Sequence, residues 1–340
     1  MTGPRLELTR AQILAYRRNV GLLDDRLPPG AASLRRAAWA GLQDSMPRAA
    51  LLSIHARVAG AGASSWEHPS LVQLWGPRFG AYVVAASDLA VFSLGRMPED
   101  AAGRRRAEDL ATRLEEFLAG RRMTYGQAGH ALGVHPNYLR YAAPTGRVLI
   151  RWEGARQPTI WTVPRPETEP SEARLELARR FLRIIGPTTP AAFAKWAGIK
   201  PPRALAAFDG LAGSLIPVGT PVGDAWILAA DEPAFRAPAR TAAPARLLPS
   251  GDAYFLLQGV DRELLVREAD RRRELWTPRV WPGALLVAGE VAGTWRRAGA
   301  IVTIRTWRRL SRQERDAVEA EGESLPLPGA EGQMRVTWGE

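Results

Sequence analysis

The sequence contains no cysteine and only four histidines. The lack of cysteine excludes disulfide bonds, thiolate nucleophiles and zinc sites built on cysteine. The histidines do not form the H-E-x-x-H pattern of a helical zinc site. We therefore expect no protein-built metal site and no cofactor. The histidines are His55, His68, His130 and His135.

Long hydrophobic runs are also missing. No run approaches the roughly 20 apolar residues that a membrane-spanning helix requires. Residues 1–10 have no apolar stretch of the signal-peptide type. The sequence thus predicts a protein that does not enter a membrane and is not exported. We expect it in the cytoplasm, and with the nucleoid if its source is bacterial.

Lysine is scarce, occurring only at Lys195 and Lys200, yet the net charge is +11 and the isoelectric point is about 10.9. Arginine therefore supplies nearly all of the positive charge. A basic excess attracts phosphate backbones or anionic membrane surfaces. A GC-rich genome would also enrich arginine and alanine, so the charge favours nucleic-acid binding without establishing it.

An internal repeat relates residues 124–136 to residues 189–201, with an offset of 65 positions. In both, a threonine is followed nine residues later by glycine, then by a β-branched residue, any residue and proline. Threonine caps a helix, glycine ends one in the left-handed conformation, and proline suits the first turn of the next. Each copy therefore predicts a helix-turn-helix unit.

Two β-type segments follow each copy, and an amphipathic helix precedes each. A helix-turn-helix followed by a hairpin is a winged helix. The alternative is a pair of ordinary helical hairpins, which the matched strands disfavour. The strands are expected at residues 148–152 and 159–163, and at 215–218 and 225–228.

The N-terminal region reads as a divergent third copy. Thr9 and Gln12 form a capping box that opens a helix. A second helix is expected over residues 34–43, a third starts near Ser45 or Met46 with Pro47 in its first turn, and a strand lies near residues 80–84.

The C-terminal region has a different pattern, with little helix before a closing helix at Ser311. Its expected strands are residues 247–257, 263–266, 284–288, 291–295 and 301–306. The predicted fold class is α+β, with tandem winged-helix units, three in number, followed by a small mostly-β domain. The expected domains are residues 1–98, 99–166, 167–236 and 245–340.

Several short motifs, taken together and in order, resemble the winged helix DNA-binding proteins that include the AlkZ-like DNA glycosylases. The resemblance implies a C-shaped monomer that holds double-stranded DNA in a concave channel. It also implies removal of bulky N7-alkylated or crosslinked purines, with a Gln-x-Gln or Gln-x-Asp catalytic motif. The motifs are Gly41-Leu42-Gln43, Ala56-Arg57, Leu74-Trp75 with Arg78, Leu247-Leu248-Pro249 with Asp252, Asp261-Arg262 and residues 289–295.

Two positions depart from the family pattern. The triplet Gln43-Asp44-Ser45 has serine at its second conserved position, and Tyr82 stands where members often have histidine. These departures leave two functions open. One is a DNA glycosylase, and the other is a non-enzymatic winged-helix DNA-binding protein that acts as a regulator or lesion sensor.

The candidate catalytic residues are Gln43 and Asp44. An N7-alkylated purine is a good leaving group, so its cleavage requires a positioned water and a stabilised sugar cation. The Gln43 carbonyl would hold the water, and Asp44 would accept its proton. Alternatively, Asp44 caps a helix and Gln43 contacts phosphate. The candidate DNA-binding residues are Arg57, Arg78, His135, Asn137, Tyr138 and Arg140.

Overall fold

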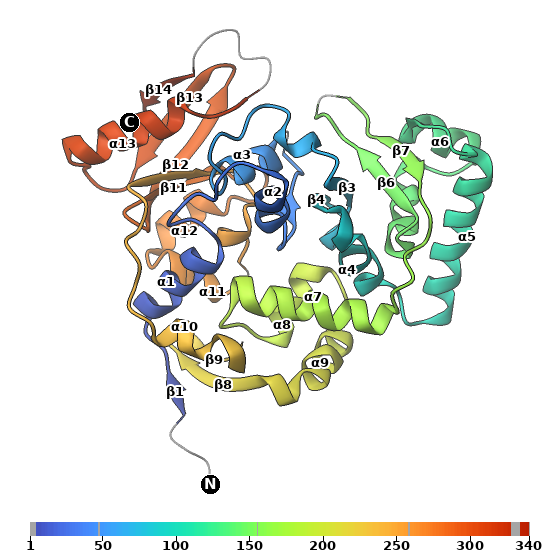
Figure 1. Cartoon of the computed structure of the whole chain (residues 1–340), viewed down its shortest axis with the longest axis horizontal. Coiled ribbons are helices and arrows are strands. Elements are labelled where there is room, and N and C mark those ends of the chain that lie inside the picture. Colours follow the sequence, from blue (N-terminus) through green and yellow to red (C-terminus); the bar gives the residue numbers. More distant parts are fainter. Residues whose placement is uncertain (1–4, 47, 155, 258, 328–333, 340) are drawn as a thin grey trace.

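The computed structural model describes residues 5–46, 48–154, 156–257, 259–327 and 334–339. The fold is mixed α+β, as predicted, with three sheets and helices between them (Figure 1). Helices α5 (Ala101–Leu118) and α6 (Tyr125–Ala131) lie at one end of the molecule. The five-stranded sheet and α13 (Arg312–Glu323) lie at the other end (Figure 1).

The N-terminal segment (residues 5–98) begins with α1 (Arg10–Val20), and the Thr9–Gln12 capping box that opens it is confirmed. The helix predicted over 34–43 is wrong beyond its first turn. Gly41 has a φ of 76°, and a Cβ there would lie 2.5 Å from the Phe92 ring. The chain therefore leaves the helix and enters a strand. The further elements are α2 (Ala31–Ala37), β2 (Leu42–Gln43), α3 (Ala49–His55), β3 (Leu71–Trp75), β4 (Ala81–Ala85) and α4 (Leu89–Ser93).

The start predicted for the third helix is also wrong, because α3 begins at Ala49 rather than at Ser45 or Met46. Pro47, which was expected in its first turn, lies outside the described residues. The strand predicted near residues 80–84 is confirmed as β4.

Two later segments share one order of elements: a helix, a short strand or bridge, two further helices and a hairpin. We call them repeat A (residues 101–165) and repeat B (residues 170–230). Trp161 and Trp226 both lie in the second strand of their hairpins. Repeat A contains α5, β5 (Met123–Thr124), α6, a 3-10 helix (Pro136–Thr145), β6 (Val148–Arg151) and β7 (Thr159–Thr162). Repeat B contains α7 (Pro170–Ile185), α8 (Pro190–Ala197), α9 (Pro201–Gly210), β8 (Leu215–Thr220) and β9 (Gly223–Leu228).

The predicted caps of both repeats are confirmed. Thr124 and Gln127 form a complete capping box, and the Thr189 side chain accepts a hydrogen bond from the backbone of Ala192. Gly133 and Gly198 have φ values of 66° and 69°, the left-handed conformation that ends a helix.

One six-stranded sheet joins the N-terminal segment to repeat A, in the order β2-β4-β3-β6-β7-β5. The junction is an antiparallel pairing of Gln73 on β3 with Ile150 on β6. A separate three-stranded sheet consists of β1 (Leu6–Glu7), β8 and β9, in which β1 runs parallel to β8.

The C-terminal segment (residues 245–339) holds a five-stranded sheet, and the closing helix at Ser311 is confirmed with its capping box. The strand predicted over 263–266 is wrong, because this stretch belongs mainly to a helix. The strand at the end of the segment was not predicted. The elements of this region are α10 (Glu232–Arg236), β10 (Ala245–Leu248), α11 (Asp261–Leu265), α12 (Ala269–Leu275), β11 (Gly283–Val287), β12 (Glu290–Ala298), β13 (Ile301–Thr306), α13 and β14 (Arg335–Trp338).

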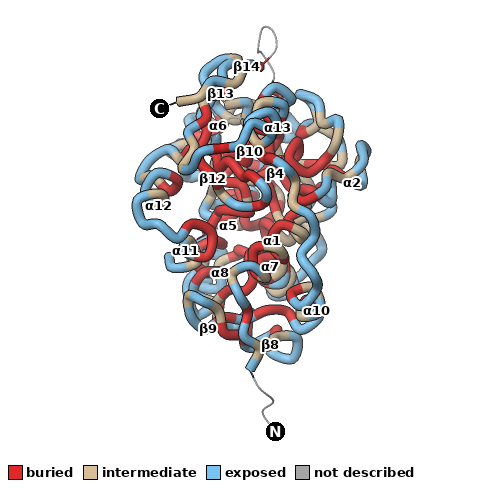
Figure 2. Tube along the Cα trace, turned by 90° about the vertical axis from the view of Figure 1, so that its left-hand side faces the viewer, coloured by how far each residue is buried: buried red, intermediate tan, exposed pale blue. Residues whose placement is uncertain are grey.

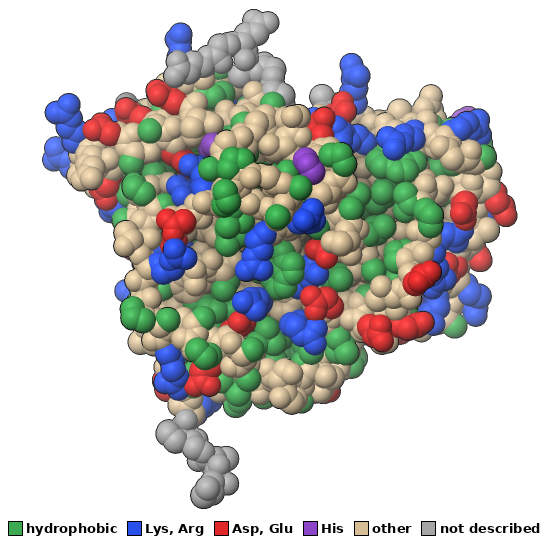
Figure 3. Space-filling model, viewed as in Figure 1, with side chains coloured by type: hydrophobic (Ala, Val, Ile, Leu, Met, Phe, Trp, Pro, Cys, Tyr) green, Lys and Arg blue, Asp and Glu red, His purple; other side chains and the backbone are tan. Residues whose placement is uncertain are grey.

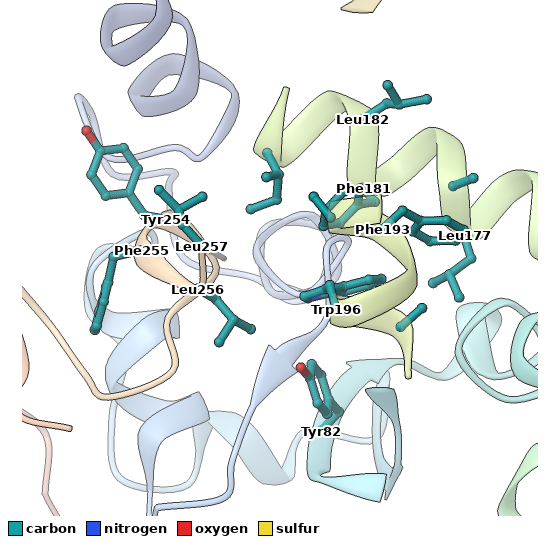
Figure 4. Packing of buried hydrophobic residues seen from close by; sticks show 14 of the residues in the cluster. Tyr82, Leu177, Phe181, Leu182, Phe193, Trp196, Tyr254, Phe255, Leu256 and Leu257 are labelled. Atoms are coloured by element: carbon teal, nitrogen blue, oxygen red, sulfur yellow. The ribbon is translucent and has the colours of Figure 1, made fainter. Parts of the chain in front are cut away.

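Buried residues run through the middle of the molecule in Figure 2. The largest cluster takes side chains from all four segments, and aromatic rings of α7 and α8 form much of it. Figure 4 shows Trp196 beside Tyr82 of β4, and residues 254–257 to the left of both. This shared core fixes β4 relative to the C-terminal segment. Within the described residues, no helix is long and apolar enough to cross a membrane.

Candidate active site

Gln43 lies on β2, directly across from Tyr82 on β4. Its side-chain oxygen accepts hydrogen bonds from the Tyr82 hydroxyl at 3.3 Å and from the Arg78 guanidinium at 3.4 Å. Burial raises the pKa of Tyr82, so its hydroxyl remains protonated and available as a donor. The two donors set the orientation of the Gln43 amide.

The C-terminal segment closes over this amide at Gly251. A Cβ at residue 251 would lie 3.1 Å from Cδ of Gln43, and Gly251 has a φ of 81°. Both the close approach and the left-handed backbone favour glycine. The contact brings a loop 208 positions away in the sequence against β2, so neither segment alone forms the site.

Arg78 lies in a tight turn between β3 and β4. Arg78 and Phe79 both have a left-handed backbone, with φ values of 54° and 57°. Repeat B packs on this turn, since a Cβ at Gly198 would lie 3.0 Å from the Arg78 backbone nitrogen. Such strained residues persist only where the surroundings hold them. Repeat B therefore helps to place Arg78 beside Gln43.

A pocket of about 450 Å³ opens at Gln43. Arg78 and Arg279 supply two positive charges, and no carboxylate is among the described residues that line it. The pocket therefore favours an anionic ligand such as a phosphate backbone. Its lining residues are Gln43, Ser45, Met46, Pro77, Arg78, Gly80, Ser250, Gly251, Leu256, Arg279, Val280 and Trp281.

Positive side chains are not confined to this pocket. Figure 3 shows lysine and arginine side chains gathered over the middle of the face that it draws. Among the described residues, no group of three or more acidic or histidine side chains is placed to hold a metal ion.

Asp44 is not among the residues that line this pocket, so the structure does not bring the two predicted catalytic residues together there. Asp44 directly follows β2, and its side chain is buried, with only 1% exposed. Its carboxylate accepts hydrogen bonds from the Ala50 backbone at 3.0 Å and from the Gln73 amide at 2.7 Å. The alternative role of Asp44 was to cap a helix. Asp44 is not the N-cap residue of α3, but its carboxylate accepts a hydrogen bond from a backbone N–H in the first turn of that helix.

Burial raises the pKa of Asp44 to about 7, and this gives a pH prediction. Between about pH 4 and pH 7 the folded state keeps a proton that the unfolded chain releases, so this group loses its stabilising contribution as pH rises. We expect wild type to lose up to about 4 kcal/mol of unfolding free energy relative to Asp44→Asn over this range. Urea unfolding of both proteins at pH 4.5 and pH 8 measures this change. An equal difference at both pH values contradicts it.

Arg57, a predicted DNA contact, is buried in the structure. It is 4% exposed and forms a bidentate ion pair with Asp252, with N···O distances of 2.7 and 2.8 Å. Asp252 also accepts hydrogen bonds from Ser53 and from the Tyr254 backbone. This pair links the chain just after α3 to the loop that contains Gly251. Arg57 therefore helps to hold Gly251 against Gln43.

The other predicted DNA-binding residues lie in repeat A. The Asn137 backbone donates to the His135 ring at 3.2 Å, so His135 acts as a cap. Tyr138 is 55% exposed. Arg140 is half-buried, with its guanidinium 5.9 Å from the centre of the Trp75 ring. The segment that carries them is a 3-10 helix.

Of all the predicted residues, the structure brings Gln43 and Arg78 together. His135, Asn137, Tyr138 and Arg140 do not line the Gln43 pocket. Sequence reasoning missed Arg279, Trp281 and Gly251, because no local pattern marks contacts with a loop so distant in sequence. Tyr82 was noticed as a departure from the family motif, but its hydrogen bond to Gln43 was not foreseen.

Comparisons with known proteins show the family and the fold of the chain. Residues 37–326 match the family described as "DNA glycosylase AlkZ-like". The solved structure of the Streptomyces sahachiroi DNA glycosylase AlkZ is similar in fold, with a TM-score of 0.78 and 18% sequence identity. The match covers 98% of this chain and 100% of that one. No curated protein sequence matches.

Proposed function

Because the chain belongs to the AlkZ-like DNA glycosylase family, we propose that it binds damaged double-stranded DNA and hydrolyses the N-glycosidic bond of N7-alkylated purines. The observation that supports this most directly is Gln43, whose amide is held by Tyr82 and Arg78 in a pocket that carries positive charge. Bulky and crosslinked adducts are included in the proposed substrate class.

The pocket suits a reaction in which the base leaves first. An N7-alkylated purine already carries a positive charge, so its departure needs little proton transfer, and an oxocarbenium-like sugar develops. Because Asp44 is buried, we assign the orientation of a water molecule to Gln43, which lines the pocket. Its carbonyl dipole also favours the developing positive charge.

DNA binding would change the contacts of Gln43. Arg78 is exposed and rests 3.4 Å from the Gln43 oxygen, a long contact. A DNA phosphate would attract this guanidinium more strongly than a neutral amide does. Its departure would leave an acceptor site on the Gln43 oxygen for water, while Tyr82 keeps the amide in place.

The architecture supports binding to duplex DNA. We propose that the N-terminal segment, repeat A and repeat B are three winged-helix units, with the C-terminal segment as a fourth, β-rich domain. Support comes from the common element order of the two repeats and from the sheet shared by repeat A and the N-terminal segment. We propose that the protein acts as a monomer in the cytoplasm, where it meets genomic DNA.

Formation of abasic sites tests the proposed activity. The purified protein is incubated with duplex DNA that carries N7-methylguanine or a bulkier N7-alkylguanine, and strand cleavage at abasic sites is measured. We expect a protein-dependent yield on alkylated duplex and none on undamaged duplex. If the yield of abasic sites is the same with and without protein, and damaged duplex is bound more tightly than undamaged duplex, the result would favour the non-enzymatic lesion sensor.

Removal of the Tyr82 hydroxyl tests how the amide is held. In Tyr82→Phe the Gln43 oxygen loses a donor, and we expect abasic-site formation to slow by about tenfold, the loss typical of about 1.4 kcal/mol. Affinity for the DNA should change little. A rate equal to wild type in single-turnover cleavage would show that Tyr82 does not orient Gln43.

Salt dependence tests the role of Arg279. If it neutralises one phosphate, Arg279→Ala should lower affinity for all duplex sequences and reduce the slope of log K against log salt by about 1. Fluorescence anisotropy titrations from low to moderate salt measure both quantities. Arg236→Ala is the control, since Arg236 lies on α10 and is paired with Glu232. Equal slopes for wild type and Arg279→Ala would show that Arg279 does not neutralise a DNA phosphate.

A further inference from the structure

A second pocket, of about 410 Å³, adjoins the Gln43 pocket. The two share Ser45 and Gly80 in their walls. The second pocket lies where the sheet passes from the N-terminal segment to repeat A, and we call it the aromatic pocket. Its lining residues are Ser45, Trp75, Phe79, Gly80, Ala81, Tyr125, Arg140, Ile150, Trp152, Arg156, Gln157 and Pro158.

Four aromatic side chains line this pocket. Trp75 is buried, and Tyr125 packs edge-on against it with ring centres 6.3 Å apart. Phe79 and Trp152 are half-buried and so keep part of their surface open. Aromatic faces of this kind bind flat π-systems by stacking.

The polar groups of the aromatic pocket are donors and amides. Arg140 and Arg156 are cationic, Gln157 offers an amide, and no carboxylate is among the described residues that line it. The Nε atom of Arg140 is buried and has no hydrogen-bond partner within the described part of the chain. A buried donor without an acceptor costs free energy, so an acceptor supplied by a ligand would stabilise Arg140.

These features define the ligand as a flat aromatic group with hydrogen-bond acceptors, attached to an anionic chain. The geometry points to a nucleobase of the bound DNA, unstacked beside the lesion and inserted between the aromatic side chains, with an acceptor atom at Arg140. This inference rests on the proposed function, since it requires damaged DNA at Gln43. A lesion weakens base pairing, which lowers the cost of unstacking a base.

Photochemical crosslinking locates the inserted base without any protein variant. 5-Iodouracil replaces a base next to, or opposite, an N7-methylguanine whose sugar carries a 2′-fluorine, which slows cleavage by destabilising the sugar cation. Irradiation couples iodouracil to aromatic side chains on which it stacks. We expect crosslinked peptides that contain Trp152, Tyr125 or Phe79. Crosslinks that map only elsewhere overturn the inference.

A matched pair of variants tests the acceptor contact. Arg140→Met keeps the aliphatic packing on Trp75 but removes the donor, and we expect about tenfold weaker binding to damaged duplex with little change for undamaged duplex. Arg122→Met is the control, because Arg122 stacks on Trp161 in the same repeat, outside the pocket. Equal losses in both variants overturn the inference.

The crosslinking result can be distinguished from the test of the proposed glycosylase activity. Abasic-site formation without crosslinks in the aromatic pocket leaves the glycosylase activity and removes the base-binding site. Crosslinks in the pocket without abasic sites support base insertion in a protein that binds lesions and does not cleave them.

Discussion

Gln43→Ala is expected to lower abasic-site formation on N7-alkylguanine duplex by about 100-fold to 1000-fold, the loss seen when one polar group that acts in a transition state is removed. The substitution removes the amide that accepts hydrogen bonds from Tyr82 and Arg78 in the pocket. Affinity for the same DNA should stay within a few-fold of wild type, because a group that acts in the transition state affects rate more than binding.

Single-turnover cleavage and anisotropy binding measure the two effects separately. Gln313→Ala is the control, since Gln313 is exposed on α13, far along the chain from the pocket. Parallel losses of rate and affinity in Gln43→Ala would show that Gln43 only binds DNA. A rate close to wild type would remove Gln43 from the chemistry.

Asp252→Ala is expected to lower the free energy of unfolding by about 3–5 kcal/mol, since removing one partner leaves the other charge buried and unpaired. Both side chains of the Arg57–Asp252 pair are almost fully buried. Asp270→Ala is the matched control. Its pair with Arg273 is exposed on α12, so its loss should cost less than about 1 kcal/mol.

At acid pH, the difference in unfolding free energy between wild type and Asp252→Ala should become smaller. Burial opposes ionisation of Asp252, but the Arg57 guanidinium and its hydrogen bonds outweigh it and lower its pKa. A lowered pKa stabilises the fold above the ordinary aspartate pKa, and this contribution is lost as pH falls through the folded value. Urea unfolding at pH 3.5 and pH 7 tests this, and a constant difference between variant and wild type contradicts it.

Sequence patterns predicted the local features of this fold well. The caps at Thr9, Thr124, Thr189 and Ser311 all form, because each depends on residues within three positions. The equivalent positions of Trp161 and Trp226 followed from a simple offset. These features need no knowledge of the rest of the chain.

Features that depend on distant partners were not predictable. Arg57 looked like a surface cation because nothing near it in the sequence shows Asp252 opposite it. Gly41 looked like one residue of a helix, although the Phe92 ring excludes a Cβ there. Asp44 adjoins Gln43 in the sequence, but its carboxylate is buried against Ala50 and Gln73, which no local pattern predicts.

The candidate site followed the same rule. Gln43 was found from the family resemblance and not from spacing. Its partners Gly251 and Arg279 come from the C-terminal segment, and no periodicity connects them to β2. The pairing of Gln43 with Tyr82 depends on the register of β2 and β4, which a strand as short as β2 does not reveal.

Strand β1 and helix α1 have several partners that are made much later in the chain. Leu6 on β1 pairs with Val218, the buried Arg17 guanidinium donates to Gly186 and Pro187, and Tyr16 bonds Asp231. At 5–20 residues per second, a ribosome needs on the order of 10–40 s to pass from the first of these positions to the last. Helix α1 therefore completes these contacts only after residues 186–231 have been synthesised.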